Sequence, residues 1–253
     1  MLTEQDIIFQ NKHYVAINKP HGLLVHPSML VKHETECAMK QLRDLLGQWV
    51  YPVHRLDRAT SGVLIFGLTS EAASKLAVKF SNREVRKEYL ALVRGFTANE
   101  ATIAHPLFEI RNRLTGRPKA REKPPQEAVT RYKTIEHIEL PIPMAPHPTS
   151  RYSTVLAIPE TGRQQQIRRH FKHIFHPIIG DPKHGDAKHN RLFAERFACN
   201  RLMLHSRLLG FIDPFSGNQE TIIAPLDTSF SEVIVRAGFN LEKMLIMQDY
   251  AAL

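Results

Sequence analysis

The sequence GVLIFGL occupies residues 62–68 and follows directly on the sequence HRLDRATS at residues 54–61. Seven consecutive uncharged residues, rich in branched and aromatic side chains, are typical of a strand buried on both faces of a sheet. The polar residues before it then form a loop at the edge of that sheet. This loop carries one carboxylate, Asp57, between Arg55 and Arg58. The stretch therefore predicts a central strand preceded by a charged loop, a position at which proteins often carry function.

Strands and helices are predicted on both sides of this stretch. A strand is expected at residues 14–18 and a helix at 36–47, where Gly47 is placed to end it. Ser70 is expected to cap a second helix. The other expected elements are strands at 88–93, 128–138, 152–158, 202–212 and 221–224, a helix beginning near residue 162 after a capping box of Thr161 and Gln164, and a helix at 231–237. This order predicts a mixed α/β fold.

Length and composition are those of a folded globular protein. The chain has 253 residues, of which 43% are hydrophobic and 23% charged. Two irregular segments, the basic residues 111–127 and the proline-rich residues 141–148, lack the features of a domain boundary. A single domain over residues 1–253 is therefore predicted. Neither a signal peptide nor a membrane-spanning segment is expected, and two cysteines are too few for a disulfide framework, which fits the cytoplasm.

The charge of the chain suggests a polyanionic partner. Lys and Arg total 34 against 25 Asp and Glu, which gives a formal net charge of +9. Such an excess favours nucleic acid, but it also occurs in proteins that bind anionic membranes and in proteins that bind neither. The basic segment 111–127 is either a phosphate-binding loop or a solvated insert.

Five histidines occur between residues 170 and 189, and imidazole is a common zinc ligand. His170, His173 and His176 have helical spacing, but no acidic or thiol partner completes a ligand pattern such as H-E-x-x-H. A metal-dependent nuclease or hydrolase is therefore a rival hypothesis, and no metal site is predicted. Contacts to nucleic acid or to neighbouring side chains explain these histidines more simply.

Asp57 by itself has two interpretations. The neighbouring arginines favour the ionised form of its carboxylate, which suits a nucleophile or a base. An Asp between arginines, however, more often forms an ion pair or caps a turn. A catalytic role is favoured by the combination of this loop with further polar groups in fixed order, at residues 87–89, 161–163 and 166–168.

Five blocks of the sequence share a pattern with one enzyme family. They are HRLD with TSG at 54–57 and 60–62, K-x-Y at 87–89, TGR with QIR at 161–163 and 166–168, HPI with GD at 176–178 and 180–181, and RL with LH at 201–202 and 204–205. The opening NKP at 18–20, followed by Gly22, matches as well. From Asn18 to His205 the sequence thus resembles the RluA family of RNA pseudouridine synthases. One departure is Gln165, where the family usually has histidine.

This resemblance implies a reaction, a fold and a catalytic group. RluA-type enzymes isomerise uridine in place, so no cofactor is expected. Their catalytic fold has a mixed, largely antiparallel central sheet flanked by helices and loops, with the active-site cleft across the sheet. By resemblance, Asp57 attacks either C1′ of the ribose or C6 of the uracil, and Arg168 is its ion-pair partner. Tyr89 would stack on the uracil and is placed to assist removal of the C5 proton.

Other positions of the family pattern are expected to bind the RNA. Arg55 would fill the gap left by a flipped-out nucleotide, and Ile167 and Leu204 would form an apolar wall. The remaining residues expected to bind RNA are His54, Arg58, Lys87, Thr161, Arg163, Gln166 and Arg169. Each role has a plainer alternative, such as a phosphate contact for Arg168 or a packed core position for Tyr89.

The resemblance also points to a substrate. The short start of the chain, the histidine-rich run at 176–186 and the basic insert are similar to a branch of the family that modifies tRNA at position 65. tRNA is therefore the expected partner and ribosomal RNA the alternative, with no membrane and no obligate protein partner. Strand-like sequence begins almost at once, so the small N-terminal RNA-binding domain of larger members, of the S4 type, is not expected. A non-catalytic RNA-binding protein is the alternative of another class.

Overall fold

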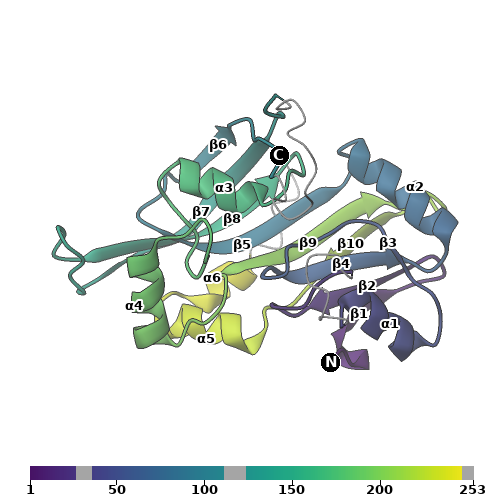
Figure 1. The fold of residues 1–253 in the computed structure, drawn as a ribbon, viewed down its shortest axis with the longest axis horizontal. Coiled ribbons are helices and arrows are strands. Elements are labelled where there is room, and N and C mark those ends of the chain that lie inside the picture. Colours follow the sequence, from purple (N-terminus) through teal and green to yellow (C-terminus); the bar gives the residue numbers. More distant parts are fainter. Residues whose placement is uncertain (27–35, 111–123, 247–253) are drawn as a thin grey trace, which may run out of the picture.

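The computed structural model describes residues 1–26, 36–110 and 124–246. Within them, ten strands form one sheet in the order β1-β2-β4-β9-β5-β8-β7-β6, with β3 beside β4 and β10 beside β9. Neighbours pair antiparallel, except that β4 and β9 pair parallel. The strands are β1 Ile7–Gln10, β2 Tyr14–Lys19, β3 Tyr51–Pro52, β4 Ser61–Gly67, β5 Arg86–Arg94, β6 Glu100–Ala104, β7 Val129–Leu140, β8 Ser150–Pro159, β9 Leu204–Ile212 and β10 Gln219–Ile223. The expected mixed fold with a largely antiparallel sheet is confirmed (Figure 1).

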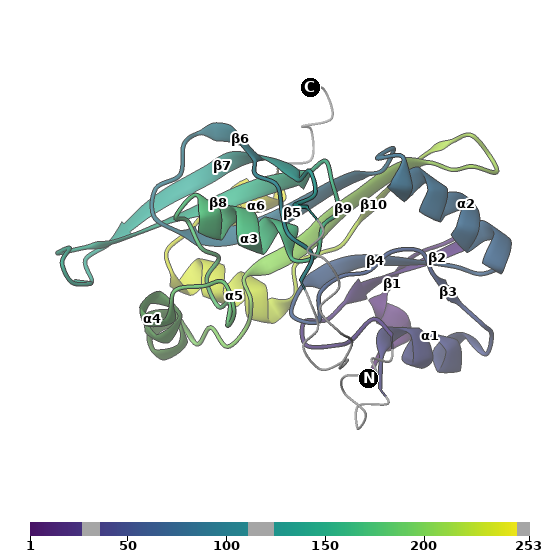
Figure 2. The same ribbon diagram turned by 45° about the horizontal axis from the view of Figure 1, so that its top comes forward.

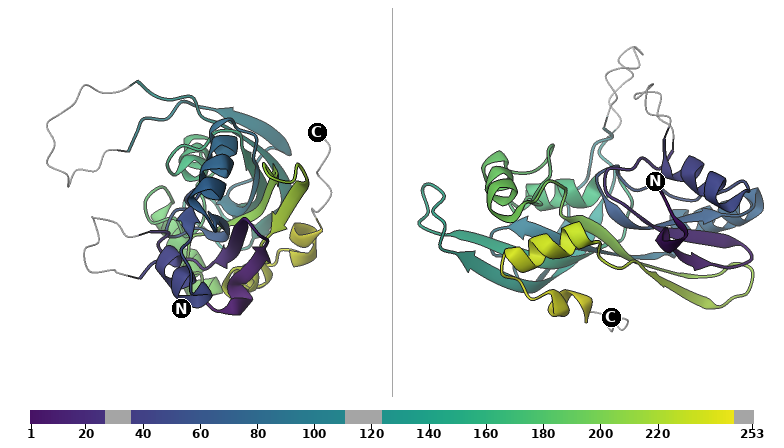
Figure 3. Two further views of the ribbon diagram at one scale, coloured as in Figure 1. Left: turned by 90° about the vertical axis from the view of Figure 1, so that its right-hand side faces the viewer. Right: turned by 90° about the horizontal axis from the view of Figure 1, so that it is seen from below.

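Helices lie beside both halves of this sheet (Figures 1 and 2). They are η1 Glu4–Asp6, α1 Ala38–Leu46, α2 Ser70–Ser81, α3 Gln166–His173, α4 Ala187–Phe197, α5 Thr228–Arg236 and α6 Leu241–Leu245. The helices α1 and α2 lie beside the half that contains β1 to β4, whereas α3 contacts β7 and β8 in the other half. Figure 3 shows α5 and α6 side by side. No helix in the described ranges has the length and apolar character needed to cross a membrane.

The central strand β4 is buried along its whole length, as its apolar sequence predicts. Alternate side chains point to opposite faces of a strand. Ile65 accordingly packs in one cluster with Leu76 of α2, and Leu64 packs in another with Leu42 of α1. The expected helix end at Gly47 is also confirmed, because this residue ends α1 with a φ of 63°.

Gly62 allows β4 to approach β9 closely. Its φ is +107°, and a Cβ atom built there would lie 2.1 Å from the backbone oxygen of Ser206. Only glycine fits such an approach. The parallel pairing is brief, joining Ser61 to His205 and Gly62 to Ser206. It brings the loop before β4 against the start of β9, and so places that loop near the middle of the sheet.

The start of α3 differs from expectation. The capping box of Thr161 and Gln164 does not form, and the helix begins at Gln166, after Gln165 in the left-handed conformation with φ 55°. The hydroxyl of Thr161 has other partners, since it accepts from the backbone N–H of Val129 at 2.9 Å and donates to Oε1 of Gln166 at 2.7 Å. The side chain therefore ties the loop to β7 instead of starting the helix.

Two further helix starts are corrected by their capping groups. The hydroxyl that caps α2 belongs to Thr69, which accepts from the N–H of Ala72 at 3.1 Å, and not to Ser70. The last expected helix begins at Thr228 instead of residue 231, because the carboxylate of Asp227 accepts from the N–H of Phe230 at 3.0 Å.

Most other expected elements have bounds within two residues of those observed. Several elements have no counterpart among the expectations, namely η1, β1, β3, β6, α4 and α6. The helix α4 follows Asp186, whose side chain caps it through the N–H groups of Lys188 and His189. Residues 111–123, most of the expected basic loop, lie outside the described residues.

Candidate active site

Asp57 lies on the loop between β3 and β4, and the start of the chain holds this loop in place. The buried Nζ of Lys19 donates to three carbonyl oxygens, including that of Arg58 at 3.2 Å. The N–H of Gly22 also donates to the Arg58 carbonyl, at 2.8 Å, and Nε of Arg58 returns a bond of 2.8 Å to Gly22. Arg58, expected to bind RNA, thus braces the loop and does not line the pocket described below.

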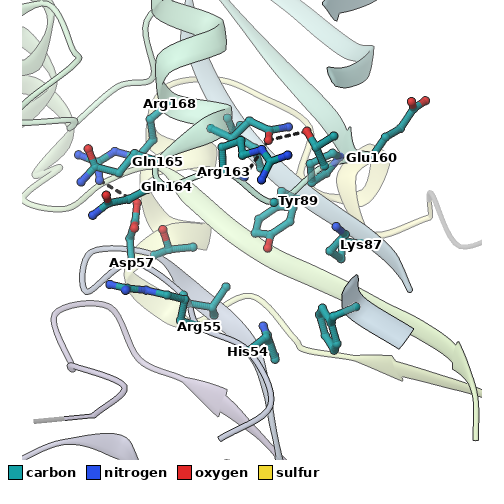
Figure 4. A pocket seen from close by; sticks show the side chains of 18 of the residues that line it. His54, Arg55, Asp57, Lys87, Tyr89, Glu160, Arg163, Gln164, Gln165 and Arg168 are labelled. Atoms are coloured by element: carbon teal, nitrogen blue, oxygen red, sulfur yellow. Dashed lines mark hydrogen bonds and ion pairs between the residues drawn. The ribbon is translucent and has the colours of Figure 1, made fainter. Parts of the chain in front are cut away.

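The structure brings the carboxylate of Asp57 and the guanidinium of Arg168 together from opposite halves of the sheet (Figure 4). Nη1 of Arg168 donates to Oδ2 of Asp57 at 2.9 Å. Arg168 lies in the first turns of α3 and is only 5% exposed, whereas the side chain of Asp57 is 19% exposed. Within the described residues no group donates a hydrogen bond to Oδ1 of Asp57, and Asp57 lines the pocket described below.

Arg168 has a second carboxylate partner, Asp181, that sequence reasoning did not select. Nε and Nη2 of Arg168 donate to Oδ2 and Oδ1 of Asp181 at 2.7 and 2.8 Å. Burial alone would raise the pKa of Asp181, but hydrogen bonds from Arg168 and from two backbone N–H groups outweigh it and hold this pKa below its usual range. Burial likewise opposes the charge of Arg168, and the two carboxylates keep its pKa raised.

Asp57 and Arg168 line a pocket of about 630 Å³ (Figure 4). Its walls come from the Asp57 loop, the end of α2, the start of β5, the segment between β8 and α3, and the first residue of β9. The expected site residues that line it are His54, Arg55, Asp57, Lys87, Tyr89, Thr161, Arg163, Gln166, Ile167, Arg168 and Leu204. The pocket therefore gathers almost all of the residues taken from the family pattern.

Tyr89 provides an aromatic surface of the pocket, which the aliphatic side chains of Ile167 and Leu204 also line. Burial raises the pKa of Tyr89 to about 12, with a further contribution from the nearby charge of Asp57. The phenol is therefore protonated throughout the neutral range. In that form it can stack on a base and donate a hydrogen bond, but it cannot accept a proton from carbon.

His54 and Lys87 form the side of the pocket next to α2. The ring of His54 stacks on Phe80, with centroids 4.7 Å apart, and its Nε2 accepts the backbone N–H of Ile65 at 3.2 Å. Burial and the charge of Lys87 lower the pKa of His54 to about 3, so this imidazole is neutral. Burial, followed by the charge of Arg83, also lowers the pKa of Lys87. Arg55 lies exposed at the rim.

Thr161 and Gln166 hold one wall of the pocket in place through hydrogen bonds. Oε1 of Gln166 accepts from the hydroxyl of Thr161 at 2.7 Å and from the N–H of Arg163 at 3.0 Å, and Nε2 donates to the carbonyl of Val129 at 2.9 Å. Both side chains are buried. Nε of Arg163 donates to the carbonyl of Glu127 at 3.0 Å. These contacts fix the segment that presents Arg163 to the pocket.

Arg169 does not join the other predicted site residues. It borders a second hollow of about 400 Å³, which we call the α3 groove. The groove is lined by His105, Leu107, Arg169, Lys172, His173, Phe175 and His184. Oε1 of Gln165, which lines the pocket, accepts a hydrogen bond of 2.8 Å from Nε2 of His184, which lines the groove. Sequence reasoning missed Asp181 and His184 as contributors, although both lie in the histidine-rich run that the pattern singled out.

The histidines between residues 170 and 189 have protein partners. His170 contacts the Thr130 hydroxyl and the His105 carbonyl, both at 3.0 Å. His176 contacts the Arg94 carbonyl at 2.8 Å, and His189 the hydroxyl of Tyr152 at 2.8 Å. Across the described ranges no group of three His, Cys, Asp or Glu side chains could hold a metal ion.

Comparison with known proteins identifies the family. Residues 13–173 match the RNA pseudouridylate synthase family. The chain is 46% identical to tRNA pseudouridine synthase C of Pasteurella multocida (strain Pm70) over 229 residues, which are 90% of this chain and 94% of that protein. It is 45% identical to the protein of the same name from Salmonella typhi over 235 residues, 93% and 90% of the two chains.

Solved structures agree with the sequence comparison. Human RNA pseudouridylate synthase domain containing 1 superposes with a TM-score of 0.66 and 26% identity, covering 87% of this chain and 83% of that one. Human RNA pseudouridylate synthase domain containing 4 has the same fold, with a TM-score of 0.68 and 24% identity over 92% of both chains. The chain therefore belongs to the RNA pseudouridylate synthase family, in the RluA type that its motifs resemble.

Proposed function

We propose that this protein isomerises uridine to pseudouridine in tRNA, at position 65, with Asp57 as the catalytic carboxylate. The observation that carries the proposal is the ion pair of Asp57 and Arg168 at 2.9 Å, on the wall of a pocket that also holds Tyr89. Relatives that share 43–46% identity over at least 90% of this chain are named tRNA pseudouridine synthase C, which supports tRNA as the substrate.

The arrangement suits a reaction that needs one anionic nucleophile. Isomerisation breaks the bond between ribose C1′ and N1 of uracil, forms a bond from C1′ to C5, and moves the C5 proton to solvent while N1 gains one. Electrons balance without a redox partner. Arg168 holds Oδ2 of Asp57 and stabilises its charge, and Oδ1 is left to attack C1′ or C6. The apolar and aromatic walls exclude water from the reacting atoms.

The target nucleotide must leave its helix to reach this pocket, at a cost of a few kcal/mol. Tyr89 would stack on the flipped uracil, and Ile167 and Leu204 would contact its other side. Arg55, exposed at the rim, would occupy the gap in the RNA. Because His54 is neutral, we assign its ring to the pocket wall and not to a phosphate.

The RNA backbone would follow the cations around the pocket and along α3. Lys87 and Arg163 lie at the pocket, and Arg169 and Lys172 border the α3 groove. Within the described residues none of these four side chains forms an ion pair, whereas Arg83, which also lines the pocket, pairs with Glu127 at 2.6 Å. Cations that form no ion pair within the described residues suit phosphate binding.

We also propose that residues 1–253 act as one catalytic domain in the cytoplasm. Strands from both halves of the chain join one sheet, and the pocket takes residues from both. Cys37 and Cys199 are free and buried, which is compatible with a reducing compartment.

Replacement of Asp57 by Asn tests the catalytic assignment, because the amide keeps the shape of the carboxylate. Tritium release from tRNA labelled at C5 of uracil should fall below detection, while tRNA binding measured by filter retention should persist. Asp44→Asn, on α1 and outside the pocket, is the matched control and should release tritium at the wild-type rate. Isomerisation by the Asp57→Asn protein would overturn the assignment.

The substrate is tested by deletion of the gene and mapping of pseudouridines across tRNA and ribosomal RNA. Chemical adducts that stop reverse transcriptase at pseudouridine locate each site. Loss at tRNA position 65 alone is the expected result. Loss confined to ribosomal RNA would replace tRNA as the substrate, and an unchanged map would contradict the proposed activity.

A further inference from the structure

Asp181 is the most buried carboxylate near the pocket, and the mechanism above does not use it. Its side chain is 0% exposed, and both of its oxygens accept from Arg168, at 2.7 and 2.8 Å. Asp57, in contrast, receives a single bond from the same guanidinium. Arg168 is thus attached firmly to Asp181 and extends its remaining end toward Asp57.

Asp181 is itself held rigidly. Its Oδ1 accepts the backbone N–H groups of Lys183 and His184 at 2.8 and 2.9 Å. Its backbone carbonyl accepts from the Asn190 side chain at 2.9 Å, and the Asn190 amide oxygen accepts the N–H of Gly180 at 2.8 Å. Gly180 has a φ of +74°, and a Cβ there would lie 1.8 Å from the Arg201 carbonyl. These contacts restrict the position of the carboxylate.

We propose that Asp181 is a positioning residue for the isomerisation, an inference that rests on the proposed function. By occupying the Nε and Nη2 edge of Arg168, Asp181 fixes the plane of the guanidinium so that Nη1 meets only Oδ2 of Asp57. Oδ1 of Asp57 then stays free and oriented for attack. A guanidinium without this anchor would be able to rotate and engage both oxygens of Asp57 in a bidentate pair.

The charges support the same role. One cation lies between two carboxylates, so the three groups carry a net charge of −1. Asp181 has no contact with the pocket, and its charge is compensated by Arg168 and two backbone N–H groups. Asp57, the member that faces the substrate, therefore shares the charge of Arg168 with Asp181, and it also interacts with the charge of Lys19. Without Asp181, Arg168 would neutralise Asp57 more fully.

The Asp181→Asn variant tests this proposal, because the amide oxygen can still accept the two backbone N–H groups. The amide nitrogen would face Nε of Arg168, where it cannot accept. We expect the single-turnover rate at saturating tRNA to fall by about 100-fold, as a small misplacement of a reacting group can cause. The dissociation constant for tRNA should stay the same. The matched control is Asp227→Asn, which removes the charge of the carboxylate paired with another buried arginine, Arg201, and should leave the rate unchanged.

A double-mutant cycle separates positioning from general support of the fold. Arg168→Lys retains the charge but removes the fork that Asp181 orients. In that background, Asp181→Asn should change the rate by less than about threefold, because the two residues act as one unit. Rate losses that multiply, or a wild-type rate in Asp181→Asn, would overturn the proposal.

Two further results complete the test. If Asp181→Asn does not fold, Asn190→Ala is measured instead, since it loosens the same turn without removing a charge. A several-fold lower rate with unchanged tRNA affinity supports the proposal, and a wild-type rate contradicts it. If the wild-type protein itself isomerises no RNA, the proposed function fails and this inference with it. An active wild type with an equally active Asp181 variant overturns this inference alone.

Discussion

His184 donates a hydrogen bond from Nε2 to Oε1 of Gln165 over 2.8 Å, at the point where the pocket meets the α3 groove. Burial lowers the pKa of His184 to about 4, so the donor is a neutral imidazole. Gln165 stands where the family usually has histidine, and here a histidine from another segment contacts that position. The contact therefore links the wall of the pocket to the wall of the α3 groove.

The α3 groove should contribute to RNA affinity through charge. Arg169→Gln combined with Lys172→Gln removes two cations that border it. The logarithm of the tRNA association constant should then depend less steeply on the logarithm of salt, with a slope smaller by about 1 to 2. Filter binding at several salt concentrations measures this slope. Arg236→Gln, which breaks an exposed ion pair with Glu232, is the control. An unchanged slope in the double variant would show that these two residues of the groove do not contact RNA phosphates.

The aromatic ring of Tyr89 should contribute more to the single-turnover rate than its hydroxyl does. With a pKa of about 12, the phenol is protonated at neutral pH and is not a base. Tyr89→Phe keeps the stacking surface, and loss of one hydrogen bond should lower the single-turnover rate by about tenfold or less. Tyr89→Ala removes the stacking and should lower the rate by roughly 5- to 150-fold. If phenylalanine proved as damaging as alanine, proton transfer through the hydroxyl would be the better explanation.

The central part of the fold could be predicted because local pattern decides it. The uncharged run of β4 and the glycine after α1 each specify their element without distant partners. The prediction of a capping box at Thr161 was wrong because the Thr161 hydroxyl instead accepts a hydrogen bond from the N–H of Val129 in β7. The edge strand β6 reads EATIA, has only five residues and buries only Ile103, so its sequence gives little sign of a strand.

Most residues that line the pocket could be named from the family pattern, whereas contacts that depend on the folded geometry could not. Arg168 and Arg169 are consecutive on α3, where neighbouring residues point about 100° apart, and only the folded chain shows that Arg168 lines the pocket while Arg169 lines the α3 groove. Arg58 donates a hydrogen bond to the Gly22 carbonyl and does not line the pocket. Asp181 lies 13 residues beyond Arg168, and only the folded chain shows that the two side chains meet.

Arg168 should be required for stability as well as for the reaction. Arg168→Met leaves the buried Asp181 without a counter-charge, and loss of one partner of a buried pair costs about 3–5 kcal/mol of unfolding free energy. Arg168→Lys should recover part of that stability but not the rate, because an ammonium cannot serve both carboxylates in fixed geometry. Urea unfolding followed by circular dichroism gives the first quantity and tritium release the second. A fully active lysine variant would contradict the role of the guanidinium fork.

The buried histidines should make the protein sensitive to acid. Burial lowers the pKa of His205 to about 4, and its ring nitrogens contact the Ser61 hydroxyl at 2.9 Å and the Ala224 carbonyl at 3.2 Å. An unfolded histidine has a pKa near 6.5, so between these values the unfolded chain binds the extra proton and stability falls as the pH falls.

His205 alone would lower the free energy of unfolding by on the order of 3 kcal/mol between about pH 6.5 and pH 4. His54, His170 and His184 have lowered pKa values and act in the same direction. His205→Gln should therefore be less stable than the wild type at pH 7, yet its unfolding free energy should decline less steeply toward pH 4. Urea unfolding across this range measures the slope, with the exposed His147→Gln as the control. Equal slopes in the His205 variant and the wild type would show that this imidazole does not drive the acid transition.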